Sequence, residues 1–179
     1  MLIVLLHSAW VQAHTLLGRR GFAKVLAQHV RPGELNTTIM HYEAALRVGL
    51  IAPIDRRFEL ASLHQQAGDV PRSVELLTGI LKEDPTHAEA RYRLGELALA
   101  QGDRHAAIRY WTENLVSGQG RSGARRIEML VRTAMALGAL KETMFDADGA
   151  RAAYANGLEH APDDAGLLFA SGRLAHRTG

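Results

Sequence analysis

Apolar and turn-forming positions between residues 57 and 115 recur with a spacing of 34 residues. Gly68 and Asp69 return as Gly102 and Asp103, and these residue types favour a tight turn. The apolar positions return with them: Leu60 as Leu94, Leu63 as Leu97, Val74 as Ile108 and Leu81 as Leu115. Because turn and apolar positions keep the same spacing, the pattern predicts one antiparallel helical hairpin copied twice.

The same spacing extends in both directions, with one interruption. Upstream, a weaker copy of the hairpin is predicted from about Arg19 to Ala52, with its turn at Gly33. Downstream, nine extra residues fall in the Gly- and Ser-rich stretch 117–123, which predicts a loop followed by a lengthened helix from about Ala124. The period then resumes: Leu137, Gly138, Ala150 and Tyr154 take the positions of Leu94, Gly95, Ala107 and Trp111.

One copy of the hairpin carries the residues of a known repeat. The matching positions are Leu94, Gly95, Ala107, Trp111 and, before the first helix, Pro85. They resemble the pattern of the tetratricopeptide repeat (TPR) family, although Arg91 and Ala98 stand where that pattern has Trp and Tyr. Gly95 and Ala107 lack bulk, which would let two antiparallel helices cross closely while Trp111 fills the gap to the next hairpin.

This resemblance implies an all-α fold, a right-handed α-solenoid of antiparallel helical hairpins with about four repeats and a partial fifth. Residues 19–179 would form the solenoid, with a Gly-rich loop between repeats at about 117–124. Ser171 and Gly172 start the fifth unit, whose turn would fall at the last residue. Two interpretations stay open: the last helix caps the stack, or the native chain continues beyond Gly179.

Residues 1–17 hold 12 apolar side chains and no formal charge, and Arg19 and Arg20 follow closely. Three interpretations are open. The first is an N-terminal apolar helix, residues 1–18, that caps the first repeat with Trp10 in the core. The second is a membrane-spanning helix flanked by the arginine pair, although about 20 apolar residues are the usual length. The third is a secretory signal, although such signals begin with basic residues.

An anchor that ends in Gly-Arg-Arg and precedes repeats of this kind resembles the inner-membrane TPR adaptors of Gram-negative lipopolysaccharide assembly. That resemblance implies a bacterial assembly subunit. Those adaptors carry a cysteine-rich metal domain at the far end, and this sequence has no cysteine.

The charge is balanced, because 21 basic and 19 acidic side chains alternate along the chain. They indicate solvated helix faces and not the concentrated basic surface that nucleic-acid binding needs. The absence of cysteine excludes disulfides, zinc fingers and thiol catalysis. With 47% hydrophobic residues the chain can bury a substantial core. We therefore expect a folded cytoplasmic protein, tethered in the membrane interpretation to the cytoplasmic face of the inner membrane.

Candidate chemistry is sparse. Residues 118–123 match the G-x-G-x-x-G pattern of dinucleotide sites, but a predicted helix precedes them where such a site needs a strand. None of the nine histidines lies three or four residues from another on one predicted helix, the spacing that brings two rings to one metal ion. We therefore expect no cofactor, no metal site and no catalytic residue, and predict that the chain is not an enzyme.

In a solenoid of this type, residues one turn round from the packing face of each first helix line a concave groove. In the predicted register these are Asp55, Phe58, Gln65, Glu89, Tyr92, Glu96, Arg132, Met135 and Glu142. Exposed apolar side chains beside acids suit an extended or helical peptide with apolar anchors and some basic character. We therefore predict a scaffold or adaptor that binds a protein or peptide in this groove. The alternative is a membrane-anchored assembly subunit of a larger complex, tethered through residues 1–17.

Overall fold

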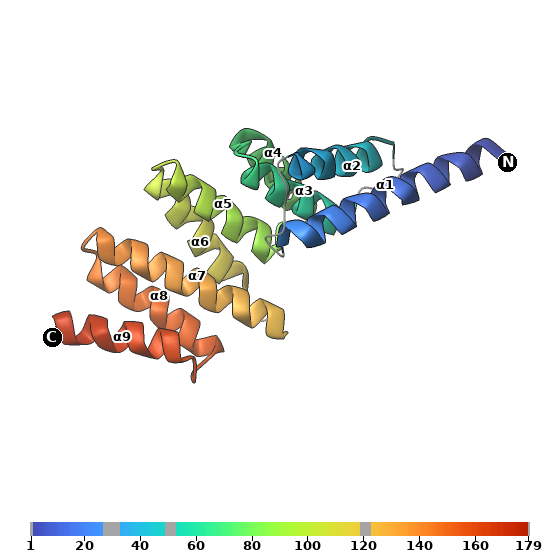
Figure 1. Cartoon of the computed structure of the whole chain (residues 1–179). Coiled ribbons are helices and arrows are strands. Elements are labelled where there is room, and N and C mark those ends of the chain that lie inside the picture. Colours follow the sequence, from blue (N-terminus) through green and yellow to red (C-terminus); the bar gives the residue numbers. More distant parts are fainter. Residues whose placement is uncertain (1, 27–32, 49–52, 119–122, 179) are drawn as a thin grey trace. The chain divides into compact units, whose positions relative to one another are not determined.

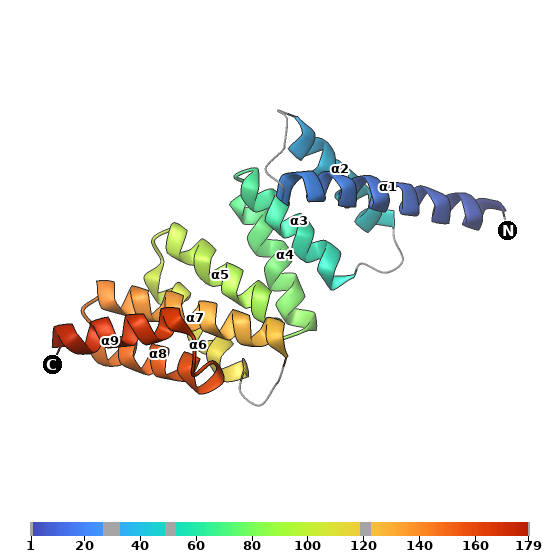
Figure 2. The same ribbon diagram turned by 60° about the horizontal axis from the view of Figure 1, so that its bottom comes forward.

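The computed structural model describes residues 2–26, 33–48, 53–118 and 123–178 (Figure 1). Within these ranges every regular element is an α-helix: α1 (Leu2–Leu26), α2 (Glu34–Val48), α3 (Ile54–Gln66), α4 (Val70–Glu83), α5 (Ala88–Ala100), α6 (Arg104–Gly118), α7 (Ala124–Thr143), α8 (Ala147–His160) and α9 (Ala165–Thr178). Successive helices pair as hairpins, α1 with α2, α3 with α4, α5 with α6 and α7 with α8, and α9 follows (Figures 1 and 2). The prediction of an all-α chain of TPR-like helical hairpins is confirmed.

The chain divides into two compact units, the N-terminal unit (residues 1–80) and the C-terminal unit (residues 81–179). The N-terminal unit contains α1, α2, α3 and most of α4. Its buried cluster consists of Val25 from α1, Tyr42 from α2, and Leu60 and Leu63 from α3, with Leu76 of α4 packed against them. One apolar cluster therefore joins all four helices of this unit.

Helix α1 is a single helix of 25 residues. It runs without a break through residue 18, where the sequence suggested a boundary between an N-terminal segment and the first repeat. It packs closely on α2 because glycines face larger side chains: a Cβ on Gly18 would lie 2.9 Å from the Tyr42 ring, and one on Gly21 would lie 2.8 Å from Thr38 Cγ2. No helix in the described ranges is both long enough and apolar enough to cross a membrane.

Two hairpin turns follow the predicted Gly-Asp pattern. Gly68 and Gly102 have φ angles of 80° and 84°, in the left-handed region that glycine enters without steric cost. The carboxylates of Asp69 and Asp103 each accept a hydrogen bond from the backbone N–H three residues later, which caps the next helix. Each Gly-Asp pair therefore ends one helix and starts the next.

The C-terminal unit repeats one packing contact. Trp111 of α6 lies over Gly95 of α5, and Tyr154 of α8 lies over Gly138 of α7. In both places an added Cβ would lie 2.6 Å from a carbon of the aromatic ring. Ala107 is fully buried in the same cluster as Trp111, so the predicted register of the small and aromatic positions is confirmed.

The insertion before the fourth hairpin lengthens α7. Helix α7 begins at Ala124, as the sequence predicted. Helix α6 extends to Gly118, two residues into the predicted loop, and residues 119–122 lie outside the described residues. Gly95 is near the middle of the 13-residue α5, but Gly138 is close to the end of the 20-residue α7. The extra residues therefore form about two additional turns at the start of α7.

Candidate protein-binding groove

The C-terminal unit has an open groove of about 590 Å³ along α5 and α7. Its lining consists of Tyr92, Glu96, Leu99 and Ala100 from α5, Arg104 and Trp111 from α6, and Ala136, Ala139, Leu140 and Thr143 from α7. Most of these side chains are small or apolar, so the groove offers a surface on which an apolar side chain of a partner could pack. Its volume lies within the range of ligand sites in proteins. We call it the α5–α7 groove.

Stacked aromatic rings fix the shape of the α5–α7 groove. The rings of Tyr92 and Trp111 stack with centroids 6.2 Å apart, and the indole Nε1 of Trp111 donates a hydrogen bond of 3.1 Å to the Tyr92 carbonyl oxygen. The Arg132 guanidinium lies over the Tyr92 ring at 6.0 Å from its centroid. Burial and the neighbouring Glu96 carboxylate raise the pKa of Tyr92 above its usual value, so its hydroxyl stays protonated and can donate.

The charged side chains at the groove differ in whether they already have an ion-pair partner. Glu96 already accepts a hydrogen bond of 2.9 Å from Arg93 within α5. Arg104 is exposed and pairs with no acidic side chain of the described residues. Among the described residues of the α5–α7 groove, the charged group that remains free to pair with a ligand is therefore the Arg104 guanidinium. The sequence had suggested that the acidic residues would favour a basic ligand.

The structure brings together only some of the nine predicted partner-binding residues. Tyr92 and Glu96 line the α5–α7 groove, and Arg132 contacts the Tyr92 ring beside it. Met135 and Glu142 lie on the other edge of α7, toward α9. Met135 Cε is 4.0 Å from the position of a Cβ on Gly166, and Glu142 contacts side chains of α9.

Three of the predicted residues belong to the N-terminal unit. Asp55, Phe58 and Gln65 all lie on α3. Asp55 is exposed, whereas Phe58 and Gln65 are half-buried. Their place in a binding surface stays a prediction.

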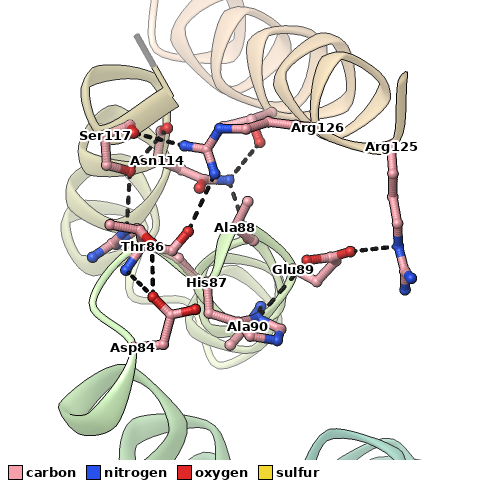
Figure 3. A network of polar contacts seen from close by, with 12 residues as sticks. Asp84, Thr86, His87, Ala88, Glu89, Ala90, Asn114, Ser117, Arg125 and Arg126 are labelled. Atoms are coloured by element: carbon pink, nitrogen blue, oxygen red, sulfur yellow. Dashed lines mark hydrogen bonds and ion pairs between the residues drawn. The ribbon is translucent and has the colours of Figure 1, made fainter. Parts of the chain in front are cut away.

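Glu89 lies in a different, smaller pocket of about 250 Å³ at the start of α5. Its carboxylate forms an ion pair of 2.7 Å with Arg125 from the extra turns of α7, and His87 Nδ1 lies 3.8 Å from the same carboxylate (Figure 3). This predicted residue therefore links two repeats inside the C-terminal unit.

The same extra turns of α7 place Arg126 in a polar network with α5 and α6 (Figure 3). Its guanidinium donates to the backbone oxygens of Thr86, at 3.2 Å, and Ser117, at 2.6 Å. Beside it, the buried Asn114 Nδ2 donates to Ala88 O at 3.2 Å and to Thr133 Oγ1 at 2.9 Å. The insertion therefore ties the third and fourth hairpins together through polar contacts.

The sequence reasoning missed three residues of α7 that line the α5–α7 groove. They are Ala136, Leu140 and Thr143, which share a helix face with Ala139, the position that Glu96 reaches when it is shifted by one repeat. These positions follow the i, i+3, i+4, i+7 spacing of one helix face. That spacing is the signal that could have identified them.

The turn between α7 and α8 differs from the other two. Phe145 takes the position that Gly68 and Gly102 hold, with a φ of 60° and a side chain that is 97% exposed. Asp146 still accepts a hydrogen bond of 2.9 Å from Gly149 N, so the helix cap is kept. A residue with a Cβ in this conformation costs about 1 kcal/mol or more, and burial does not offset that cost here.

Replacing Phe145 by glycine should therefore stabilise the C-terminal unit by about 1 kcal/mol, because glycine adopts a positive φ without strain. Urea unfolding of the full chain would measure the change. Phe145→Ala is the matched control, since it removes the ring and keeps the strain. If Phe145→Gly is no more stable than Phe145→Ala, the backbone at this turn is not strained.

Among the described residues, no three histidine, aspartate or glutamate side chains gather closely enough to hold a metal ion. Of the glycines in the G-x-G-x-x-G match, Gly118 is the last residue of α6 and Gly123 directly precedes α7, while Gly120 lies outside the described residues.

Comparison with known proteins finds one matching family profile, in the middle of the chain. A profile of the family described as tetratricopeptide repeat matches residues 58–119, which run from α3 to just beyond α6. A search of curated proteins finds no match.

Solved structures share the fold over most of the chain. A crystal structure of MamA protein matches with a TM-score of 0.68 and 18% identity, over 94% of this chain and 82% of that one. PilF of Pseudomonas aeruginosa matches with a TM-score of 0.67 and 15% identity, over 94% and 70%. A tetratricopeptide repeat protein from Parabacteroides merdae matches with a TM-score of 0.63 and 21% identity, over 91% and 58%. At these identities the likeness shows the fold alone, and the tetratricopeptide repeat match applies to residues 58–119.

Proposed function

We propose that this protein is a non-catalytic adaptor that binds a segment of a partner protein in the α5–α7 groove. The observation that carries the proposal is the groove itself: an open, largely apolar surface between two first helices of neighbouring repeats. Repeat hairpins stack to give extended binding surfaces of this kind. Leu99 is 37% exposed at this surface and offers an apolar contact that nothing in the described part of the unit covers.

The chemistry of the groove favours a segment with an apolar anchor followed or preceded by an acidic group. Apolar side chains would pack against Leu99, Ala136 and Ala139, where burial is favourable. The acidic group would pair with Arg104, whose charge has no acidic partner in the described residues, whereas Glu96 is already paired with Arg93. Charge complementarity at such a position adds specificity more than affinity.

Filling the groove should weaken binding of the partner segment. We expect Ala139→Glu to lower the affinity for the partner segment at least tenfold, because its side chain occupies the groove and repels an acidic ligand. Ala152→Glu is the matched control, since Ala152 is an exposed residue of α8 outside the groove. Both changes replace alanine by glutamate on an exposed helix face, so their effects on folding should be similar.

A peptide library displayed on phage, selected on the full chain and counter-selected on Ala139→Glu, would supply the probe. The expected consensus contains an apolar residue near Asp or Glu, with binding that Arg104→Glu weakens. A basic consensus would contradict the role of Arg104. Peptides that bind Ala139→Glu as well as the unchanged chain would place binding outside the groove.

A membrane-tethered assembly subunit is the second candidate. It is favoured by one observation, the exposure of Trp10, Leu16 and Leu17 on α1, at 43%, 52% and 45%. Such side chains would suit contact with a membrane surface or a neighbouring membrane protein. Co-sedimentation of the full chain with lipid vesicles, compared with a Leu16→Gln/Leu17→Gln variant, tests this role.

A further inference from the structure

Two histidines that are far apart in the sequence meet between α1 and α2. The Nδ1 atoms of His14 and His41 are 3.0 Å apart, and the ring centroids are 5.0 Å apart. Both rings are half-buried. Spacing along one helix could not reveal this pair, because its members come from facing helices of one hairpin.

The facing nitrogens define the chemistry available to the pair. When both rings are neutral, one Nδ1 can carry a proton and donate it to the lone pair of the other. If the donating ring changes tautomer, giving up its Nδ1 proton to solvent and taking one on Nε2, both rings are still neutral and two Nδ1 lone pairs face one another. Neutral imidazole nitrogens in this arrangement are the ligands that divalent transition-metal ions prefer.

We propose that His14 and His41 form a two-histidine site that binds Cu²⁺ through both Nδ1 atoms, with solvent completing the coordination. Metal–nitrogen bonds of about 2.0–2.1 Å would make nitrogens 3.0 Å apart subtend about 94° at the ion. Neighbouring positions of a tetragonal Cu²⁺ or Ni²⁺ ion are about 90° apart, whereas a tetrahedral Zn²⁺ ion needs about 109°. The spacing therefore favours Cu²⁺, which also binds nitrogen ligands most strongly among these ions.

The surroundings hold one ring in place and leave the other accessible. The Trp10 ring lies against His14 with centroids 4.1 Å apart, which restricts the orientation of that imidazole. His41 lines an open pocket of about 530 Å³ between α1 and α2, so solvent and ions reach this ring. This combination of an oriented ligand and an entry path is what a metal site requires.

Nearby charges limit the affinity. Arg20 and Lys24 line the same pocket as His41, and Lys24 forms an ion pair of 3.1 Å with Glu34. The charge of Arg20 opposes a bound cation, and only two protein ligands are present. We therefore expect a dissociation constant in the micromolar range.

Binding of Cu²⁺ to the full chain would be measured by calorimetry and by electron paramagnetic resonance at one equivalent of the ion. We expect hyperfine structure from two nitrogen ligands and a rise in the melting temperature, because the ion joins α1 to α2. His14→Gln and His41→Gln should each weaken binding at least tenfold. His105→Gln is the matched control, since His105 is exposed on α6, and it should leave binding unchanged.

The spectrum of the unchanged chain tests the ligand set even if a variant does not fold. A spectrum without two equivalent nitrogen ligands would overturn the proposal. Equal affinity in the unchanged chain and in folded His14→Gln and His41→Gln would overturn it too, because the ion would then be held by other histidines or by the chain terminus. A preference for Zn²⁺ over Cu²⁺ would contradict the geometric argument.

Discussion

Replacing Gly95 by alanine should destabilise the C-terminal unit by about 3 kcal/mol, the upper part of the range for overpacked cores. The added Cβ would lie 2.6 Å from Trp111 Cδ1 and 2.7 Å from Trp111 Cε2, far inside van der Waals contact. The ring cannot move aside easily, since it is 2% exposed and its Nε1 donates to the Tyr92 carbonyl oxygen. Relief would therefore require α5 and α6 to separate, with a loss of buried apolar contact along both helices.

Gly172→Ala is the matched control for this change. Gly172 lies in α9 of the same unit, and an added Cβ there would meet nothing within 4 Å. Alanine should stabilise that position by about 0.5–1 kcal/mol, because it loses less backbone entropy in a helix than glycine. Urea unfolding of both variants gives the comparison. If Gly95→Ala is as stable as Gly172→Ala, the close approach of α5 and α6 does not depend on glycine at position 95.

The fold could be predicted from the sequence because the contact between a glycine and an aromatic ring recurs within two hairpins of the C-terminal unit. Gly95 and Trp111 recur as Gly138 and Tyr154 with an unchanged separation, and each pair fixes the crossing of two helices. Such local constraints survive the insertion before α7, since they act within one hairpin. The register of the hairpins therefore follows from residue types and spacing alone.

The candidate site was harder to predict, because it depends on contacts between hairpins. The predicted groove residues of α7 came from shifting those of α5 by one repeat, which turns Tyr92 into Met135. Such a shift selects the same edge on each first helix, namely the edge that faces the first helix of the following repeat: α7 for α5, and α9 for α7. Tyr92 therefore lies at the α5–α7 groove, whereas Met135 lies toward α9. Of the α7 residues that line the groove, Ala139 and Thr143 correspond to Glu96 and Ala100 in that shift, whereas Ala136 and Leu140 correspond to α5 residues that do not line it.

The ion pairs at the predicted site could not be predicted from the sequence either. The acids of the predicted site suggested a basic ligand, but Glu96 and Glu89 are paired with Arg93 and Arg125. Arg125 belongs to the inserted turns of α7, which have no counterpart in the other repeats. A pairing of that kind depends on the length of the insertion and on how α7 packs, and the repeat pattern contains neither.

Glu142 is the most buried acid whose pairing the repeat pattern does not predict. Replacing it by glutamine should destabilise the C-terminal unit by about 2–3 kcal/mol. Its side chain is 7% exposed. One carboxylate oxygen accepts hydrogen bonds from the Tyr154 hydroxyl, at 2.6 Å, and Arg173, at 2.9 Å, and the other accepts from Arg177 at 2.6 Å. A glutamine amide group would point N–H donors at one of the arginines and would carry no charge to offset the other. Contacts that hold α9 to α7 would be lost.

The pH dependence of this difference follows from the carboxylate. The hydrogen bond from Tyr154, and then those from Arg177 and Arg173, lower the pKa of Glu142 below the reference value of 4.5. Because the folded pKa is the lower one, the stabilisation is fully present above pH 4.5 and is lost as the pH falls through the folded pKa. The burial and the Glu142 partner raise the pKa of Tyr154 to about 12, so the hydroxyl remains a donor throughout this range.

Urea unfolding of the unchanged chain and Glu142→Gln between pH 7 and pH 3 would test both statements. The gap in stability should stay constant down to about pH 4.5 and then narrow, while hydrogen exchange in α9 should be faster in the variant at neutral pH. Glu159→Gln is the matched control, since Glu159 is exposed on α8, and its stability should follow the unchanged chain. A gap that stays the same at every pH would mean that Glu142 acts by packing and not by charge, because a neutral carboxyl group fills the same space as the amide.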